Sequence, residues 1–154
     1  MLESRLGPLD IETVVSGYLR YSRRPRDDDD AYDYDHPDTI ADDAVRNAIV
    51  SAPAPVVWEL VRTLLRQVED DELSFHAAGP LEDLVALRGA ELVDEIEAEA
   101  RQDARFRWAL GCIWLSYGAL PDAVLERAVR ASGGQIKPLP PRTERRNLPS
   151  KRET

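Results

Sequence analysis

FHAAGPLEDLV, residues 75–85, combines a histidine, a Gly-Pro pair and two adjacent carboxylates. Glycine is favoured where a helix ends, and proline is tolerated at the first position of a helix. Glu82 and Asp83 then fall in the first turn of the second helix, where the helix dipole favours anions. We therefore interpret the segment as a junction, with one helix ending at Gly79 and the next beginning at Pro80.

Helical spacing of apolar residues continues on both sides of this junction. On the amino-terminal side it predicts a helix from Ile11 capped by Asp10, a helix from Pro37 to about Val50, and a helix through Val57 and Val68. On the carboxyl-terminal side it predicts a stop at Gly89, a helix through Leu92 and Ala100, a helix from the Asp103 cap to Gly118, and a last helix from near Pro121 to Gly133.

No segment shows the alternation of a strand together with turn residues, so the fold class is predicted to be all-α. A chain of 154 residues suits one compact domain. About six to seven short helices then form either an orthogonal bundle or a short stack of helical hairpins. We expect a helical domain over residues 1–134, with an acidic loop at 26–37, and a basic, proline-containing, disordered tail over 135–154.

The net charge of −9 is unevenly distributed along the chain. Residues 135–154 contain six basic and two acidic residues, a charge of +4, so residues 1–134 carry −13. An acidic body of this size repels nucleic acid, whereas the basic tail suits an acidic surface. Nucleic acid is therefore expected as a partner only through the tail.

Several classes of protein are disfavoured by composition. The amino terminus lacks the apolar run of a signal peptide, and no stretch approaches the roughly 18 apolar residues that span a bilayer, so we expect a cytoplasmic protein with no membrane partner. Cys112 is the only cysteine and lies in an apolar run, which predicts a buried thiol and no metal site. Nucleotide-binding and hydrolase motifs are absent, and no cofactor is expected. The preference for arginine over lysine indicates a bacterial source.

Aspartates and tyrosines alternate in the acidic loop. A calcium loop requires a glycine and a distal glutamate that this segment lacks. The loop is either simply solvated or a recognition surface for a basic protein. For the second interpretation the candidate partner-binding residues are Asp27, Asp28, Asp29, Asp30, Tyr32, Asp33, Tyr34 and Asp35.

Two further candidates lie outside the loop. Trp108 falls off the apolar face of its helix, and an exposed tryptophan there predicts an interface. In an alternative interpretation His76 is a general base oriented by Glu82 or Asp83, which requires hydrogen-bond reach across the Gly-Pro turn. The end of one helix at Gly79 and the start of the next at Pro80 explain the same residues without a ligand site.

The segments AAGPLEDLV and GAELVDEIEAEARQDARFRWALGCIW resemble an uncharacterised bacterial family of unknown function. Its members carry a GPLEDLL-type segment, an IExEA helix and a D-P-x-F-R joint. GYLRYSRRPR and VVWELVRTLL resemble its amino-terminal half, so the resemblance spans residues 17–115. It implies a small α-helical domain and no known activity.

From the residues we expect a non-enzymatic, acidic helical protein that binds a protein partner, for example an immunity-like or antitoxin-like protein. The alternatives are an enzyme or small-ligand protein that uses His76 with Glu82 and Asp83, and an adaptor that contacts nucleic acid through its basic tail.

Overall fold

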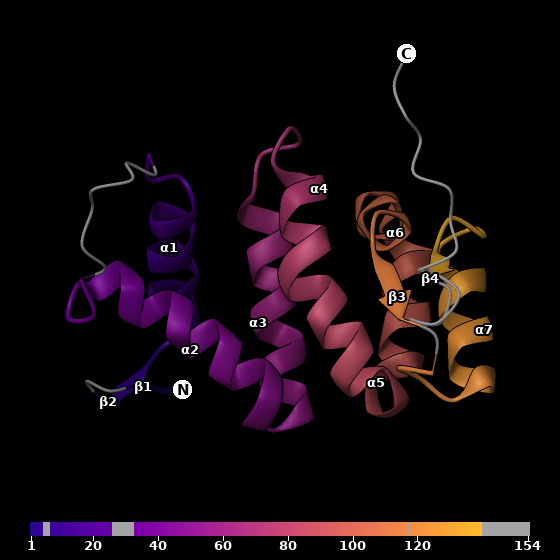
Figure 1. Ribbon diagram of the computed structural model, residues 1–154, viewed down its shortest axis with the longest axis horizontal. Helices are drawn as coiled ribbons and strands as arrows, with labels where there is room; N and C mark the ends of the chain where they lie inside the picture. The colour runs from indigo at the N-terminus through magenta and orange to yellow at the C-terminus, as the bar shows by residue number, and fades with distance from the viewer. Residues whose placement is uncertain (5–6, 26–32, 117, 140–154) are drawn as a thin grey trace, which may run out of the picture.

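The helices follow one another in chain order along the long axis of the molecule (Figure 1). In the computed structural model they are α1 (Ile11–Ser22), α2 (Pro37–Ser51), α3 (Ala54–Gln67), α4 (Leu73–His76), α5 (Glu82–Gln102), α6 (Ala104–Gly111) and α7 (Asp122–Ala131). The structure describes residues 1–4, 7–25, 33–116 and 118–139. Helices α1 and α2 lie at one end and α6 and α7 at the other. The predicted all-α single domain is confirmed.

Local signals set the starts of the first two helices as predicted. The carboxylate of Asp10 accepts hydrogen bonds from the Thr13 amide at 2.9 Å and the Thr13 hydroxyl at 2.7 Å, which caps α1. Pro37 occupies the first turn of α2, where its missing N–H leaves no bond unmade. The cap of α2 is His36, whose Nδ1 accepts a hydrogen bond from the Asp38 amide at 3.1 Å.

One continuous hydrophobic core joins the elements. Its centre is formed by side chains with no exposed surface from α3, α5 and α6, namely Leu60, Leu64, Leu84, Ile96 and Leu110. Burial of each such side chain contributes about 1.5–3 kcal/mol. Because the cluster extends from Leu2 to Ile136, the described chain forms one folding unit.

The junction predicted at Gly79 and Pro80 is wrong, because the backbone stays helical from Leu73 to Gln102. A π-helix, η1 (Ala77–Leu81), joins α4 to α5, and the Glu82 amide donates to the Ala77 carbonyl five residues back. The proline ring has no N–H and collides with the carbonyl four residues earlier in an ordinary α-turn. The wider π-turn accommodates the ring, so Pro80 changes the helical pitch without ending the helix.

Gly89 does not end a helix either, since it lies inside α5. A Cβ at this position would lie 3.1 Å from Cδ2 of Leu120, in the segment that leads into α7. The glycine therefore serves close packing between α5 and a distant segment. Gly133 does follow α7 as predicted, with φ of 71°, and the Gly134 amide donates to the Val129 carbonyl.

The helix predicted to run to Gly118 ends instead at Gly111. Trp114–Ser116 forms a strand, β3, that pairs in parallel with β4 (Lys137–Leu139), and β1 (Leu2–Ser4) pairs antiparallel with β2 (Gly7–Leu9). Strands of three residues are too short to produce a readable alternation. Residues 135–139 therefore belong to the domain and not to a tail, and Ile136 is only 3% exposed. Residues 140–154 of the predicted tail lie outside the described residues.

Candidate partner-binding surface

His76, the general base of the alternative interpretation, is a buried core residue at the end of α4. It is 1% exposed, and its ring meets Tyr18 at 5.6 Å and Phe75 at 5.2 Å between centroids, both edge-on. Nδ1 is buried without a hydrogen-bond partner among the described residues. Burial holds the pKa of His76 below its usual value, because a charged imidazole is poorly solvated there.

Of the two carboxylates that the alternative interpretation paired with His76, Glu82 is engaged elsewhere and Asp83 is exposed. Glu82 accepts a hydrogen bond from the Trp114 amide at 2.8 Å, which ties β3 to the start of α5. Burial raises the pKa of the Glu82 carboxyl, against the lowering effect of that bond. Asp83 is exposed, whereas His76 is enclosed. No hydrogen bond joins His76 to either carboxylate within the part of the chain that the structure covers.

The acidic segment is described only in part. Asp27, Asp28, Asp29, Asp30 and Tyr32 lie outside the described residues. Asp33, Tyr34 and Asp35 are exposed just before α2, and Asp33 Oδ1 accepts a hydrogen bond from the Asp35 amide at 3.0 Å. Figure 1 shows the start of α2 at the opposite end of the molecule from α6, which carries Trp108. Those of the predicted binding residues that the structure describes, Asp33 to Asp35 and Trp108, therefore belong to two separate surfaces.

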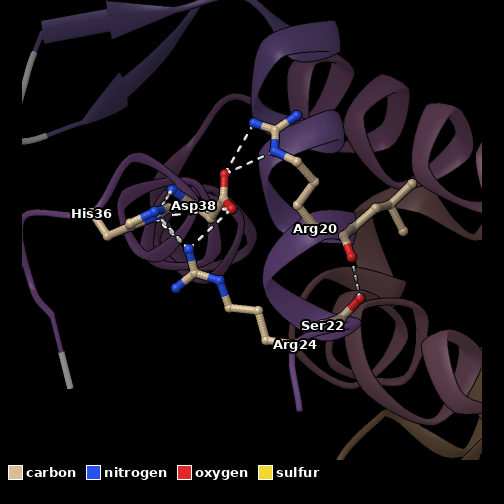
Figure 2. Close-up of polar contacts among 6 residues, drawn as sticks. Arg20, Ser22, Arg24, His36 and Asp38 are labelled. Carbon is tan, nitrogen blue, oxygen red and sulfur yellow. Dashed lines mark hydrogen bonds and ion pairs between the residues drawn. The ribbon is translucent and has the colours of Figure 1, made fainter. Parts of the chain in front are cut away.

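Asp38, a buried carboxylate near the start of α2, joins α1 to α2 (Figure 2). Arg20 donates to Asp38 Oδ1 from Nε at 3.0 Å, and Arg24 donates to Oδ2 from Nη2 at 3.2 Å. Arg24 Nη2 also lies 2.7 Å from Nδ1 of His36. Arg20 on α1 and Arg24, just beyond the end of α1, lie four residues apart, but the sequence did not show that they share a partner. This cluster fixes the helix pair and presents no free acceptor.

Two other arginines hold the ends of helices. Arg88 Nη1 donates to the carbonyls of Ile49 at 3.1 Å and Ala52 at 3.0 Å, at the carboxyl-terminal end of α2. Arg105 donates in the same way to the carbonyls of Leu65, in the last turn of α3, and of Val68, which follows it. A cation suits these positions because the carbonyls at a helix end are unpaired and the dipole is negative there. Both arginines are structural.

Trp108 is exposed, as the sequence predicted. Its helix, α6, is capped by Asp103, whose Oδ1 accepts from the Arg105 and Phe106 amides. Phe106 faces the core and packs edge-on against Trp58 at 5.7 Å between centroids. Trp108, two residues later, points away from that face and keeps 54% of its surface exposed. Helical phase thus places a large aromatic side chain on the surface.

Open grooves lie on both sides of Trp108. One, of about 360 Å³, is lined by Trp108 with Asp70, Leu73 and Arg105. The second, of about 480 Å³, is lined by Trp108 with Arg107, Cys112 and residues that precede β4. Cys112 is half-buried, and burial raises the pKa of its thiol, so it is not an activated nucleophile.

A third groove, of about 440 Å³, shares Arg107 with the second. Its lining combines small residues with charged ones, namely Glu97, Ala100, Arg101, Arg107, Arg130, Ala131 and Gly133. The three grooves therefore follow one another around α6. Among the residues on this surface, only Trp108 was predictable from the sequence as a binding residue, because the segments that line the grooves are brought together by tertiary packing.

Neither a metal site nor a membrane-spanning helix is found within the described ranges. No group of three or more His, Cys, Asp or Glu side chains there is placed to hold a metal ion. None of the helices in those ranges has both the length and the apolar character needed to cross a membrane.

Comparison with known proteins identifies a family. No curated protein and no solved structure matches the chain. Residues 29–135 match a family of unknown function, DUF6869, and this region holds all of α2 to α7 and the surface around Trp108. The resemblance to an uncharacterised family that the sequence suggested is thereby confirmed. Because the match covers well over half of the 154 residues, the chain belongs to the family of unknown function DUF6869.

Proposed function

We propose that this protein binds another protein, without catalysis, through a surface centred on Trp108. The observation that carries the proposal is a half-exposed indole set between two open grooves. Tryptophan and arginine are the side chains that most often dominate binding energy at protein interfaces. Burial of the rigid indole by a partner removes a large apolar surface from water at little cost in conformational entropy.

The placement of His76 supports a role without catalysis. A general base needs access to its substrate and a partner that orients it. His76 is enclosed between Tyr18 and Phe75, and its two expected carboxylates are engaged elsewhere or exposed. The grooves around α6 do not include this histidine.

The test compares Trp108→Ala with Leu87→Ala, because Leu87 is also exposed but lies on α5 outside these grooves. Each variant and the original chain are used as bait in a lysate of the source cells. A protein retained by the original chain is then purified, and its affinity for the three baits is measured by calorimetry. We expect Trp108→Ala to weaken binding by about tenfold or more, as for an interface hot spot.

Leu87→Ala should leave the affinity unchanged, which controls for the loss of an exposed apolar side chain. Circular dichroism of both variants checks that the fold is kept. Equal affinity of Trp108→Ala and the original chain would overturn the proposed surface. Retention of no protein by any bait would overturn the proposed function itself.

A second candidate role uses the acidic end of the molecule. Asp33, Tyr34 and Asp35 are all exposed beside the start of α2, which favours contact with a basic partner, as in an immunity-like or antitoxin-like protein. Asp33→Asn together with Asp35→Asn should then slow association, and the difference should vanish at high salt. Association that ignores both these charges and salt would count against this role.

A further inference from the structure

The unpaired arginines of the described chain are gathered in one place. Most described arginines form an ion pair with a carboxylate, namely Arg20, Arg23, Arg24, Arg46, Arg62, Arg66, Arg88, Arg105 and Arg127. Within residues 1–4, 7–25, 33–116 and 118–139, the arginines that form none are Arg101, Arg107 and Arg130. All three line the third groove beside α6.

These arginines come from three different helices. Arg101 lies in the last turn of α5, Arg130 in the last turn of α7, and Arg107 on α6. Their side chains are exposed, so no core contact requires them. The carboxyl-terminal ends of α5 and α7 favour the positive charges of Arg101 and Arg130, because the helix dipole is negative there. This favourable charge interaction does not use the guanidinium N–H groups, which stay free to donate to a ligand.

The acidic residue in the groove is already engaged. Glu97 accepts from Arg127 Nε at 3.0 Å and from Arg127 Nη2 at 2.7 Å. Those bonds lower the pKa of the Glu97 carboxyl, with a smaller effect from the charges of Arg101 and Arg130. The groove therefore keeps a positive field although the whole chain carries a net charge of −9.

We propose that this groove binds an acidic segment of the protein partner, with carboxylates of that segment on Arg101, Arg107 and Arg130. The inference rests on the proposed function, because the arginine groove continues through Arg107 into the groove beside Trp108. Guanidinium groups match carboxylates with two parallel hydrogen bonds, which suits Asp and Glu side chains. Small side chains at Ala100 and Ala131 leave room for a peptide backbone.

An acidic peptide fits this surface better than a nucleic acid does. Residues 1–134 carry a net charge of −13. A long polyanion such as a nucleic acid would be repelled by this negative charge wherever it extends beyond the groove. A short segment needs only the local positive field of three arginines. Single-stranded DNA is nevertheless a useful competitor, because it would occupy the same arginines through phosphates.

The test uses a fluorescein-labelled peptide of ten glutamates, a peptide of ten lysines and a ten-nucleotide oligothymidine as probes, at about 50 mM salt, where exposed charges are weakly screened. Fluorescence anisotropy gives the affinities of the full chain for each probe. The variant Arg107→Gln with Arg130→Gln is compared with Arg46→Gln with Arg66→Gln, which makes the same change in net charge at other sites. Side-chain Nε–Hε resonances of Arg101 and Arg107 are followed by NMR during the titration.

We expect the glutamate peptide to bind in preference to both other probes, and the groove variant to bind it about tenfold more weakly than the control variant. The Arg101 and Arg107 resonances should shift, and those of Arg88 should not. No binding of the glutamate peptide, equal weakening in both variants, or tighter binding of oligothymidine would overturn the inference.

The two proposals fail in different experiments. If the glutamate peptide does not bind but a purified partner still requires Trp108, the protein-binding function stands and the acidic occupant is wrong. If the peptide binds through the arginines but Trp108→Ala leaves the affinity for the partner unchanged, the groove stands and the proposed Trp108 surface is wrong.

Discussion

Gly17 of α1 faces Ala41 of α2 so closely that a Cβ added to Gly17 would lie 2.6 Å from the Cβ of Ala41. The same added atom would lie 3.8 Å from Asp38 Oδ1. The two helices therefore touch backbone to side chain at the level of the Asp38 cluster. Close approach lets Arg20 of α1, and Arg24 just after that helix, reach the buried Asp38 carboxylate of α2, so the glycine and the ion pairs support one another.

Gly17→Ala should separate α1 from α2 and destabilise the protein by about 1–3 kcal/mol. The added Cβ would collide with the Cβ of Ala41, and neither atom can move away by side-chain rotation. Urea unfolding followed by circular dichroism measures the change. The intrinsic helix preference of alanine works in the opposite direction, so a net gain in stability would show that the helices do not approach as closely as described.

Gly79→Ala should have the opposite effect. Gly79 lies inside the π-helix, and a Cβ there meets no atom within 4 Å. Alanine loses less conformational entropy than glycine when a helix forms, so we expect a gain of up to about 1 kcal/mol in the free energy of unfolding. A clear loss of stability in urea unfolding would instead support a left-handed helix end at this residue, as the sequence alone suggested.

Arg88→Met should destabilise the end of α2. The side chain of Arg88 is 12% exposed, and its loss would leave the carbonyls of Ile49 and Ala52 without these donors. We expect a loss of about 1–3 kcal/mol, measured by thermal unfolding. Glu91→Gln is the matched control, because it alters the exposed ion-pair partner and keeps both carbonyl contacts. A change below 1 kcal/mol is expected for that control, and equal effects of the two substitutions would refute the capping role.

The stability should depend on pH through His76. Its pKa in the folded protein is below the usual 6.5, so the unfolded chain takes up a proton first as the pH falls. The contribution of His76 to the free energy of unfolding is therefore complete above about pH 6.5. It is lost progressively as the pH falls toward the lowered pKa of the folded state. Urea unfolding at about pH 7.5 and pH 5 measures the difference.

His76→Leu removes this contribution and keeps an apolar side chain at the buried site. The free energy of unfolding of the variant should fall less between the two pH values than that of the original protein. Carboxylates that titrate in the same range are common to both proteins and cancel in the comparison. The same pH dependence in both would mean that His76 is solvated in the folded state.

The candidate surface was only partly predictable. Trp108 could be identified because helical phase is a local property of α6. The grooves on its two sides are lined by residues distant in sequence, such as Leu73 and Gln135, and no spacing rule relates these positions. Whether an arginine is paired is likewise decided by its neighbours in space, so Arg101 resembled Arg105 in the sequence although only Arg105 is paired.

The sequence by itself determined the helical class, the caps at Asp10 and Asp103, and the helix end near Gly133, because these depend on hydrogen bonds and backbone preferences within a few residues. Tertiary structure decided the course of the chain at Pro80, where packing of Ala77 and Leu81 in the core favours a continuous helix with a π-turn over a break. It also decided the strand at Trp114–Ser116, whose partner, β4, lies more than twenty residues further along the chain. Contacts between segments so far apart in the sequence produce no periodic pattern of apolar residues in either segment.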